Sequence, residues 1–136
     1  MAEIQVALRF GQAFQGALQA GERRIAIGKE AGGFSPYELL LGALGSCYYA
    51  TFVDIAKKMR LAYQGAEITV RGTKRAQAPT TLETAAIALT IRGAESQKGF
   101  ERASQLAARH CSVHHTLEKV AQITLTLRFE EGESPA

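Results

Sequence analysis

The residues of this 136-residue chain best suited to chemistry are its two cysteines, Cys47 and Cys111. A cysteine thiolate is a nucleophile and a metal ligand, whereas a buried thiol behaves as a small apolar side chain. Cys47 lies too far along its predicted helix to gain much from the N-terminal dipole, because that effect fades after the first turn. A reactive Cys47 therefore requires hydrogen bonds or positive charge from elsewhere in the fold.

A metal site is one alternative around the second cysteine. His110, His114 and Glu118 are spaced four apart, so they would form one stripe on a continuous helix, a spacing that zinc ligands can use. In this alternative His110, Cys111 and His114 bind the metal. Solvated histidines on a helix surface explain the same spacing, and we expect neither a metal nor a cofactor.

Cys47 is positioned by residues 35–60, which are predicted to form one long helix. Ser35 fits the N-cap, Pro36 fits the first helical position, and Glu38 completes a capping box with Ser35. The 15 residues 39–53 carry no charge, and their apolar side chains cover every face of the helix. Because about 20 such residues are needed to cross a bilayer, the segment predicts a buried central core helix.

A helix that is apolar on every face is difficult to cover within a chain of this size. Gly42 and Gly45 cost about 1 kcal/mol each relative to alanine inside a helix, which indicates a packing reason for them. We therefore expect a second copy of the chain to cover part of this helix in a homodimer.

The remaining pattern predicts strands and two further helices in one domain over residues 1–136. Alternating apolar residues predict strands over 3–10, 14–19, 23–28, 67–75, 82–92 and 122–129. The fourth and fifth strands form an antiparallel hairpin. Helical spacing covers 96–110, a shorter helical piece follows over about 112–119, and the polar tail 130–136 is expected to fray. The order βββ–α–ββ–α–β belongs to the α+β class.

Composition argues against several classes of partner. The formal charge is +3, from 16 basic and 13 acidic residues spread along the chain, and 46% of residues are hydrophobic. The chain has no basic run with interleaved aromatic residues, which is the pattern that would indicate a nucleic-acid surface. The N-terminus has no basic-then-apolar signal segment, so we expect a cytoplasmic protein that binds neither nucleic acid nor membrane.

Two segments resemble the OsmC/Ohr family, the osmotically inducible and organic hydroperoxide resistance proteins. The first is PYELLLGALGSC, from Pro36 to Cys47, which resembles the family's first-cysteine helix. The second begins CSV at Cys111 and resembles the second-cysteine motif, usually Cys-Pro-Val; Ser112 and the later Leu-Glu-Lys resemble the YhfA-like branch. The resemblance covers about residues 4–129. It implies an OsmC-like fold in which two long central helices pack together in an intertwined homodimer.

The resemblance also implies thiol-dependent reduction of hydroperoxides. Cys47 would attack the peroxide and become a sulfenic acid, Cys111 would condense with it to a disulfide, and an external dithiol would restore both thiols. The alternative is a non-catalytic dimer that binds a small hydrophobic ligand beside Cys47.

The sequence departs from the family's peroxidases at the acidic position ten residues before the first cysteine, which here is Tyr37. Glu38, a further catalytic candidate, lies nine residues before Cys47 and so faces the opposite side of a regular helix, about 13 Å away along its axis. It would reach a partner subunit's site or only complete the capping box. The family's peroxidases also use an N-terminal arginine, for which this chain offers three candidates: Arg9, Arg23 and Arg24.

Overall fold

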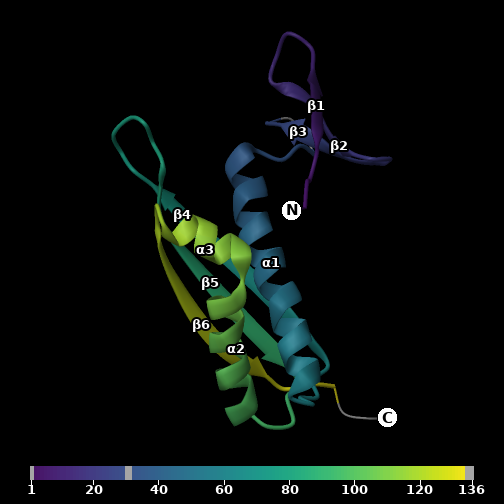
Figure 1. Cartoon of the computed structure of the whole chain (residues 1–136), viewed down its shortest axis with the longest axis vertical. Helices are drawn as coiled ribbons and strands as arrows, with labels where there is room; N and C mark the ends of the chain where they lie inside the picture. Colours follow the sequence, from purple (N-terminus) through teal and green to yellow (C-terminus); the bar gives the residue numbers. More distant parts are fainter. Residues whose placement is uncertain (1, 30–31, 134–136) are drawn as a thin grey trace. The chain divides into compact units, whose positions relative to one another are not determined.

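The structure, a computed structural model, describes residues 2–29 and 32–133 and has the predicted α+β architecture (Figure 1). The elements in chain order are β1 (Ala7–Phe10), β2 (Gln15–Ala20), β3 (Arg23–Gly28), α1 (Pro36–Lys58), β4 (Gly65–Lys74), β5 (Leu82–Arg92), α2 (Lys98–His110), α3 (Ser112–Glu118) and β6 (Gln122–Glu130). The predicted order is confirmed, with α3 as the short helical piece after the second predicted helix. The chain divides into two compact units, Met1–Leu40 and Leu41–Ala136, and the single domain over 1–136 stays a prediction.

The first unit contains an antiparallel sheet in the order β1-β2-β3. Its register places Leu8 opposite Leu18 and Leu18 opposite Ile25, so these apolar side chains share one face. β1 begins at Ala7, opposite Gln19, although the sequence pattern predicted a strand from residue 3. β2 ends at Ala20, so residues 3–5 of the predicted strand extend past its end.

Helix α1 begins and ends at recognisable capping motifs. The predicted capping box is confirmed, because the Glu38 N–H donates to Ser35 Oγ at 3.3 Å and the Ser35 N–H donates to Glu38 Oε1 at 2.9 Å. At the other end Arg60 adopts a left-handed φ of 58°, and the Leu61 N–H donates to the Ala56 carbonyl at 2.9 Å. This is a Schellman motif, and it ends the helix two residues before the predicted limit.

The buried side of α1 is a single stripe. Its four fully buried side chains are spaced four apart: Leu44, Tyr48, Phe52 and Ala56. A Cβ added at Gly45 would lie 3.0 Å from the Val70 side chain, so a glycine at this position lets β4 pack close to the helix. A Cβ added at Gly42 would have no neighbour within 4 Å in the described part of the chain. Among the described helices only α1 is long and apolar enough to cross a membrane, and its packed stripe makes it a core helix.

The second unit packs helices against a sheet in the order β4-β5-β6. β4 and β5 are antiparallel, as predicted, and β6 runs parallel to β5 after the crossover through α2 and α3. Aromatic rings join the layers: Phe100 of α2 lies 6.3 Å from Phe52 of α1 and 6.3 Å from Phe129 of β6, between ring centroids. This cluster fixes α1 and α2 side by side on the sheet (Figure 1).

The polar tail predicted over residues 130–136 begins within β6. Glu130 is the last residue of that strand, one residue inside the segment predicted to fray. Beyond it, the side chain of Gln64 exchanges hydrogen bonds of 2.7 and 2.9 Å with the backbone of Glu133. Residues 134–136 of the predicted tail lie outside the described residues.

Candidate thiol site

Cys111 stands at the junction of two helices. α2 ends at His110, Cys111 is extended (φ −75°, ψ 117°), and α3 begins at Ser112. The Cys111 side chain is the N-cap of α3 and accepts a hydrogen bond from the His114 N–H at 3.4 Å. It is fully buried, with 0% of its surface exposed. Because the helix breaks at Cys111, the alternative of one stripe of His110, His114 and Glu118 lacks the continuous helix on which it depends.

Cys47 is directed at this junction by its neighbour on α1. Tyr48 is fully buried, and its hydroxyl donates to the Ser104 carbonyl of α2 at 3.1 Å, which ties the two helices together. The half-buried Cys47 Sγ then lies 3.8 Å from the hydroxyl oxygen of Ser112. The Cys111 thiol is close enough to lower the pKa of Cys47. The structure therefore brings together two free cysteines that are distant in sequence.

The surroundings of Cys47 favour its thiolate. Partial burial raises the pKa of Cys47, but hydrogen bonds to the sulfur outweigh it. The donors are the backbone N–H of Val113, the Cys111 thiol, and the hydroxyl and N–H of Ser112. The net pKa of Cys47 is therefore below its ordinary value.

The surroundings of Cys111 favour its protonated thiol. Burial raises the pKa of Cys111, and the His114 N–H opposes this increase. The hydrogen bond to Cys47 and the charge of the Cys47 thiolate raise it further. At one pH, therefore, Cys47 is the more ionised of the pair and Cys111 is the proton donor.

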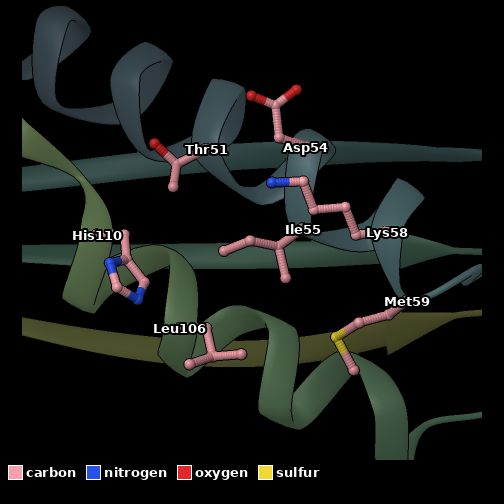
Figure 2. A pocket seen from close by; sticks show the side chains of 7 residues that line it. All are labelled: Thr51, Asp54, Ile55, Lys58, Met59, Leu106 and His110. Atoms are coloured by element: carbon pink, nitrogen blue, oxygen red, sulfur yellow. The ribbon is translucent and has the colours of Figure 1, made fainter.

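A groove lies beside the cysteine pair, between α1 and α2 (Figure 2). Its volume is about 490 Å³, and its lining is Thr51, Asp54, Ile55, Lys58, Met59, Leu106 and His110. Thr51 is one helical turn beyond Cys47, and its hydroxyl donates to the Cys47 carbonyl at 3.0 Å. His110 immediately precedes Cys111. Thr51 and His110, which line the groove, are thus near neighbours in sequence of Cys47 and Cys111.

The histidines near Cys111 interact with a carboxylate instead of forming a metal site. His115 Nδ1 lies 2.7 Å from Glu118 Oε1, and His115 Nε2 bonds to the Arg109 carbonyl. His114 Nδ1 lies 3.4 Å from Glu118 Oε2, which is an ion-pair distance when His114 is protonated. Within residues 2–29 and 32–133, no three His, Cys, Asp or Glu side chains are grouped as a metal would need. The alternative of metal binding by His110, Cys111 and His114 gains no support.

The other predicted site residues belong to the first unit. The Glu38 carboxylate accepts the backbone N–H of Ser35 at 2.9 Å, and its interactions with the backbone and side chain of Ser35 lower the pKa of Glu38. The three candidate arginines lie on exposed positions of β1 and β3: Arg9, Arg23 and Arg24.

The sequence pattern did not predict Ser112 as a neighbour of the Cys47 sulfur and indicated it only as a departure from the second-cysteine motif. Its position directly after the second cysteine was the available signal. The groove residues gave no signal, because their spacing on α1 is that of any packed helix.

The fold and the site together define a class of α+β protein. In this class, a cysteine on the central helix lies near a second cysteine at the junction of two other helices. The chain belongs to the OsmC-like protein family, whose profile matches residues 28–126. No curated protein sequence matches it.

Solved structures support the same fold. A hypothetical protein from Aquifex aeolicus VF5 is 25% identical, with a TM-score of 0.88 over 98% of this chain and 100% of its own. An organic hydroperoxide resistance protein OsmC from Legionella pneumophila is 14% identical, with a TM-score of 0.69 over 94% of this chain and 99% of its own. The organic hydroperoxide resistance protein OhrB of Bacillus subtilis is 15% identical, with a TM-score of 0.66 over 93% of this chain and 98% of its own.

Proposed function

We propose that this protein is a thiol-dependent peroxidase that reduces organic hydroperoxides in the defence against oxidative stress. The observation that carries the proposal is the pairing of Cys47 with Cys111, because their contacts shift the two thiol pKa values in opposite directions. One thiolate and one neighbouring thiol are what a nucleophile and a resolving group require. The names of the Legionella and Bacillus proteins support a redox and stress role.

The reaction has three steps: oxidation of Cys47 by the peroxide, condensation of the two cysteines to a disulfide, and reduction of the disulfide. The Cys47 thiolate attacks the outer oxygen of the hydroperoxide, so an S–O bond forms, the O–O bond breaks, and the alkoxide leaves and takes a proton to become an alcohol. The Cys111 sulfur then displaces hydroxide from the Cys47 sulfenic acid, which yields the disulfide and water. An external dithiol reduces the disulfide and becomes a disulfide itself, which restores both thiols.

The groove supports an organic substrate. Three of its side chains are apolar (Ile55, Met59 and Leu106), and the cavity begins within one helical turn of Cys47. The organic group of a hydroperoxide would lie in this groove while the peroxide oxygens meet the half-buried sulfur. Hydrogen peroxide has no organic group to place there, so it is expected to react more slowly.

The test is the intact mass and free-thiol count after one equivalent of cumene hydroperoxide. We expect a loss of about two daltons and of both thiols, each reversed by a dithiol, as disulfide formation requires. Two unreacted thiols after prolonged exposure would refute the peroxidase.

A second candidate function is binding of a small hydrophobic ligand without chemistry, and the same groove favours it. The Cys47→Ser variant separates the two candidates. A peroxidase loses all turnover with this change, whereas a binding protein keeps its affinity for an apolar fluorescent probe and shows no turnover in either form.

We also propose a cytoplasmic homodimer, in line with the predicted intertwined arrangement. The first unit carries apolar side chains that are exposed in the single chain: Leu8 (50%), Phe10 (44%) and Ile25 (40%). The sheet register places Leu8, Leu18 and Ile25 in one row on a single face. Such an exposed apolar face is typical of a surface that binds a partner.

Sedimentation equilibrium tests the dimer. We expect twice the chain mass of 14.7 kDa at all practical concentrations. Leu8→Lys should weaken the dimer, whereas Ala7→Lys, which adds the same charge to the opposite face of β1, should not. A concentration-independent monomer would refute the proposal.

A further inference from the structure

The Ser112 hydroxyl is positioned to bind the reacting sulfur. Its Oγ lies 3.8 Å from Cys47 Sγ, within hydrogen-bond range for a sulfur acceptor. Ser112 is exposed, so burial does not force this contact. The distance results from how α1 faces the junction between α2 and α3.

The usual role of a serine at the start of a helix is already filled. Serine there normally accepts a backbone N–H as the N-cap. In α3 the cap is Cys111, whose Sγ accepts the His114 N–H at 3.4 Å. Ser112 follows the cap as the first helical residue, so its hydroxyl is free to donate to Cys47.

We infer that Ser112 is a catalytic residue that donates its hydroxyl hydrogen bond to the Cys47 thiolate and so helps to set the reactivity of the attacking sulfur. A hydroxyl donor stabilises a thiolate without bringing a charge to the site. The half-buried sulfur and the exposed hydroxyl are both open to an incoming peroxide. The direction in which the pKa of Cys47 is shifted agrees with this role.

The catalytic part of this role rests on the proposed peroxidase function, whereas the effect of Ser112 on the Cys47 thiol does not. The thiol can be titrated with no peroxide present. Failure of the wild-type protein to consume hydroperoxide would refute the proposed function and leave the hydrogen bond standing. An unchanged Cys47 titration in a serine variant would refute this inference alone.

The experiment measures the rate of Cys47 alkylation by iodoacetamide as a function of pH, resolved by peptide mass spectrometry. Ser112→Ala should raise the midpoint for Cys47 by about one pH unit, the size expected for one hydrogen bond to a charged sulfur. Ser112→Thr keeps the hydroxyl and should restore a midpoint near that of the wild type. The hydroperoxide rate at a pH below the midpoint should fall by about tenfold in Ser112→Ala and recover in Ser112→Thr.

The matched control is Thr116→Ala. It removes a hydroxyl from the same helix, but that hydroxyl donates to the Ser112 carbonyl at 3.0 Å and not to a sulfur. If Thr116→Ala moved the Cys47 midpoint as far as Ser112→Ala, the effect would be a loosening of α3, and the inference would be overturned.

Salt gives an independent readout. The shift between wild type and Ser112→Ala should persist in 1 M NaCl, because a neutral hydroxyl in contact with the sulfur is not screened as a distant cation would be. Loss of the difference at high salt would show that a charged group, and not this hydroxyl, holds the thiolate.

Discussion

The Tyr48 hydroxyl donates a hydrogen bond of 3.1 Å to the Ser104 carbonyl, and both residues are buried between α1 and α2. Tyr48 directly follows Cys47, so this bond sets where the preceding thiol lies relative to the helix that leads to Cys111. Burial and the nearby Cys111 hold the pKa of Tyr48 above its usual range, so the hydroxyl remains a donor at all working pH values.

The first prediction concerns this link. Tyr48→Phe should lower the free energy of unfolding by about 1 kcal/mol, the usual net value of one hydrogen bond, as measured by urea denaturation. It should also slow formation of the Cys47–Cys111 disulfide. Tyr49→Phe removes the neighbouring hydroxyl, which bonds to Tyr63 at 2.8 Å, and should leave the disulfide rate unchanged. Equal slowing by both changes would contradict a specific role for Tyr48.

The second prediction separates the roles of the two cysteines. With one equivalent of organic hydroperoxide, Cys111→Ser should gain about 16 Da on Cys47 as a sulfenic acid that dimedone traps, because no resolving thiol remains. Cys47→Ser should gain nothing, since the buried Cys111 is held as a thiol. Oxidation of Cys111 in the Cys47→Ser variant would reverse the assignment of attacking and resolving residues.

The third prediction concerns the charge of His115. Its bond to the Arg109 carbonyl and its pairing with Glu118 raise the pKa of His115 above the ordinary value. Glu118→Gln should lower this pKa, whereas Lys119→Gln should raise it, because the Lys119 charge opposes protonation. Proton NMR titration of the imidazole checks both signs. An unmoved His115 titration in Glu118→Gln would contradict the pairing.

The raised pKa of His115 has a consequence for stability. The contribution of the protonated ring is fully present below the pKa of the unfolded chain, about 6.5. It is lost as the pH rises through the higher pKa of the folded state. Glu118→Gln should therefore flatten the stability profile in this window, as measured by urea denaturation at several pH values.

The fourth prediction tests the capping box against a catalytic role for Glu38. Ser35→Ala should cost about 1 kcal/mol of stability, because the Glu38 N–H loses its hydroxyl acceptor. Glu38→Gln keeps an oxygen acceptor for the Ser35 N–H, so turnover should stay within about twofold of wild type. A loss of turnover well beyond that in Glu38→Gln, with stability unchanged, would instead place Glu38 in the reaction.

The lowered pKa of Glu38 also predicts a pH dependence. Its bonds to Ser35 contribute stability that is present above the unfolded carboxyl pKa, about 4.3, and lost as the pH falls through the lower folded value. Glu38→Gln should remove this acid-side dependence, which urea denaturation between pH 3 and 6 would reveal.

Local sequence patterns determined most of the fold. The capping box at Ser35, the alternation in β5 and the helical spacing of α2 are short-range signals, and the structure follows each of them. The limits of the elements were less predictable. The end of α1 depends on the left-handed Arg60, and β1 is paired with β2 only from Ala7, opposite Gln19.

The sequence by itself determined that Cys47 lies on a long apolar helix and that a second cysteine follows an amphipathic one. Only the tertiary structure decided that they meet, because the Tyr48–Ser104 bond and the aromatic contacts of Phe100 join elements distant in the chain. The tertiary structure also shows that the helix carrying His110 ends before Cys111, and that Ser112 lies beside the Cys47 sulfur. The physical reason is that helix and strand periodicity are local, whereas a thiol's partners and its pKa depend on packing between elements.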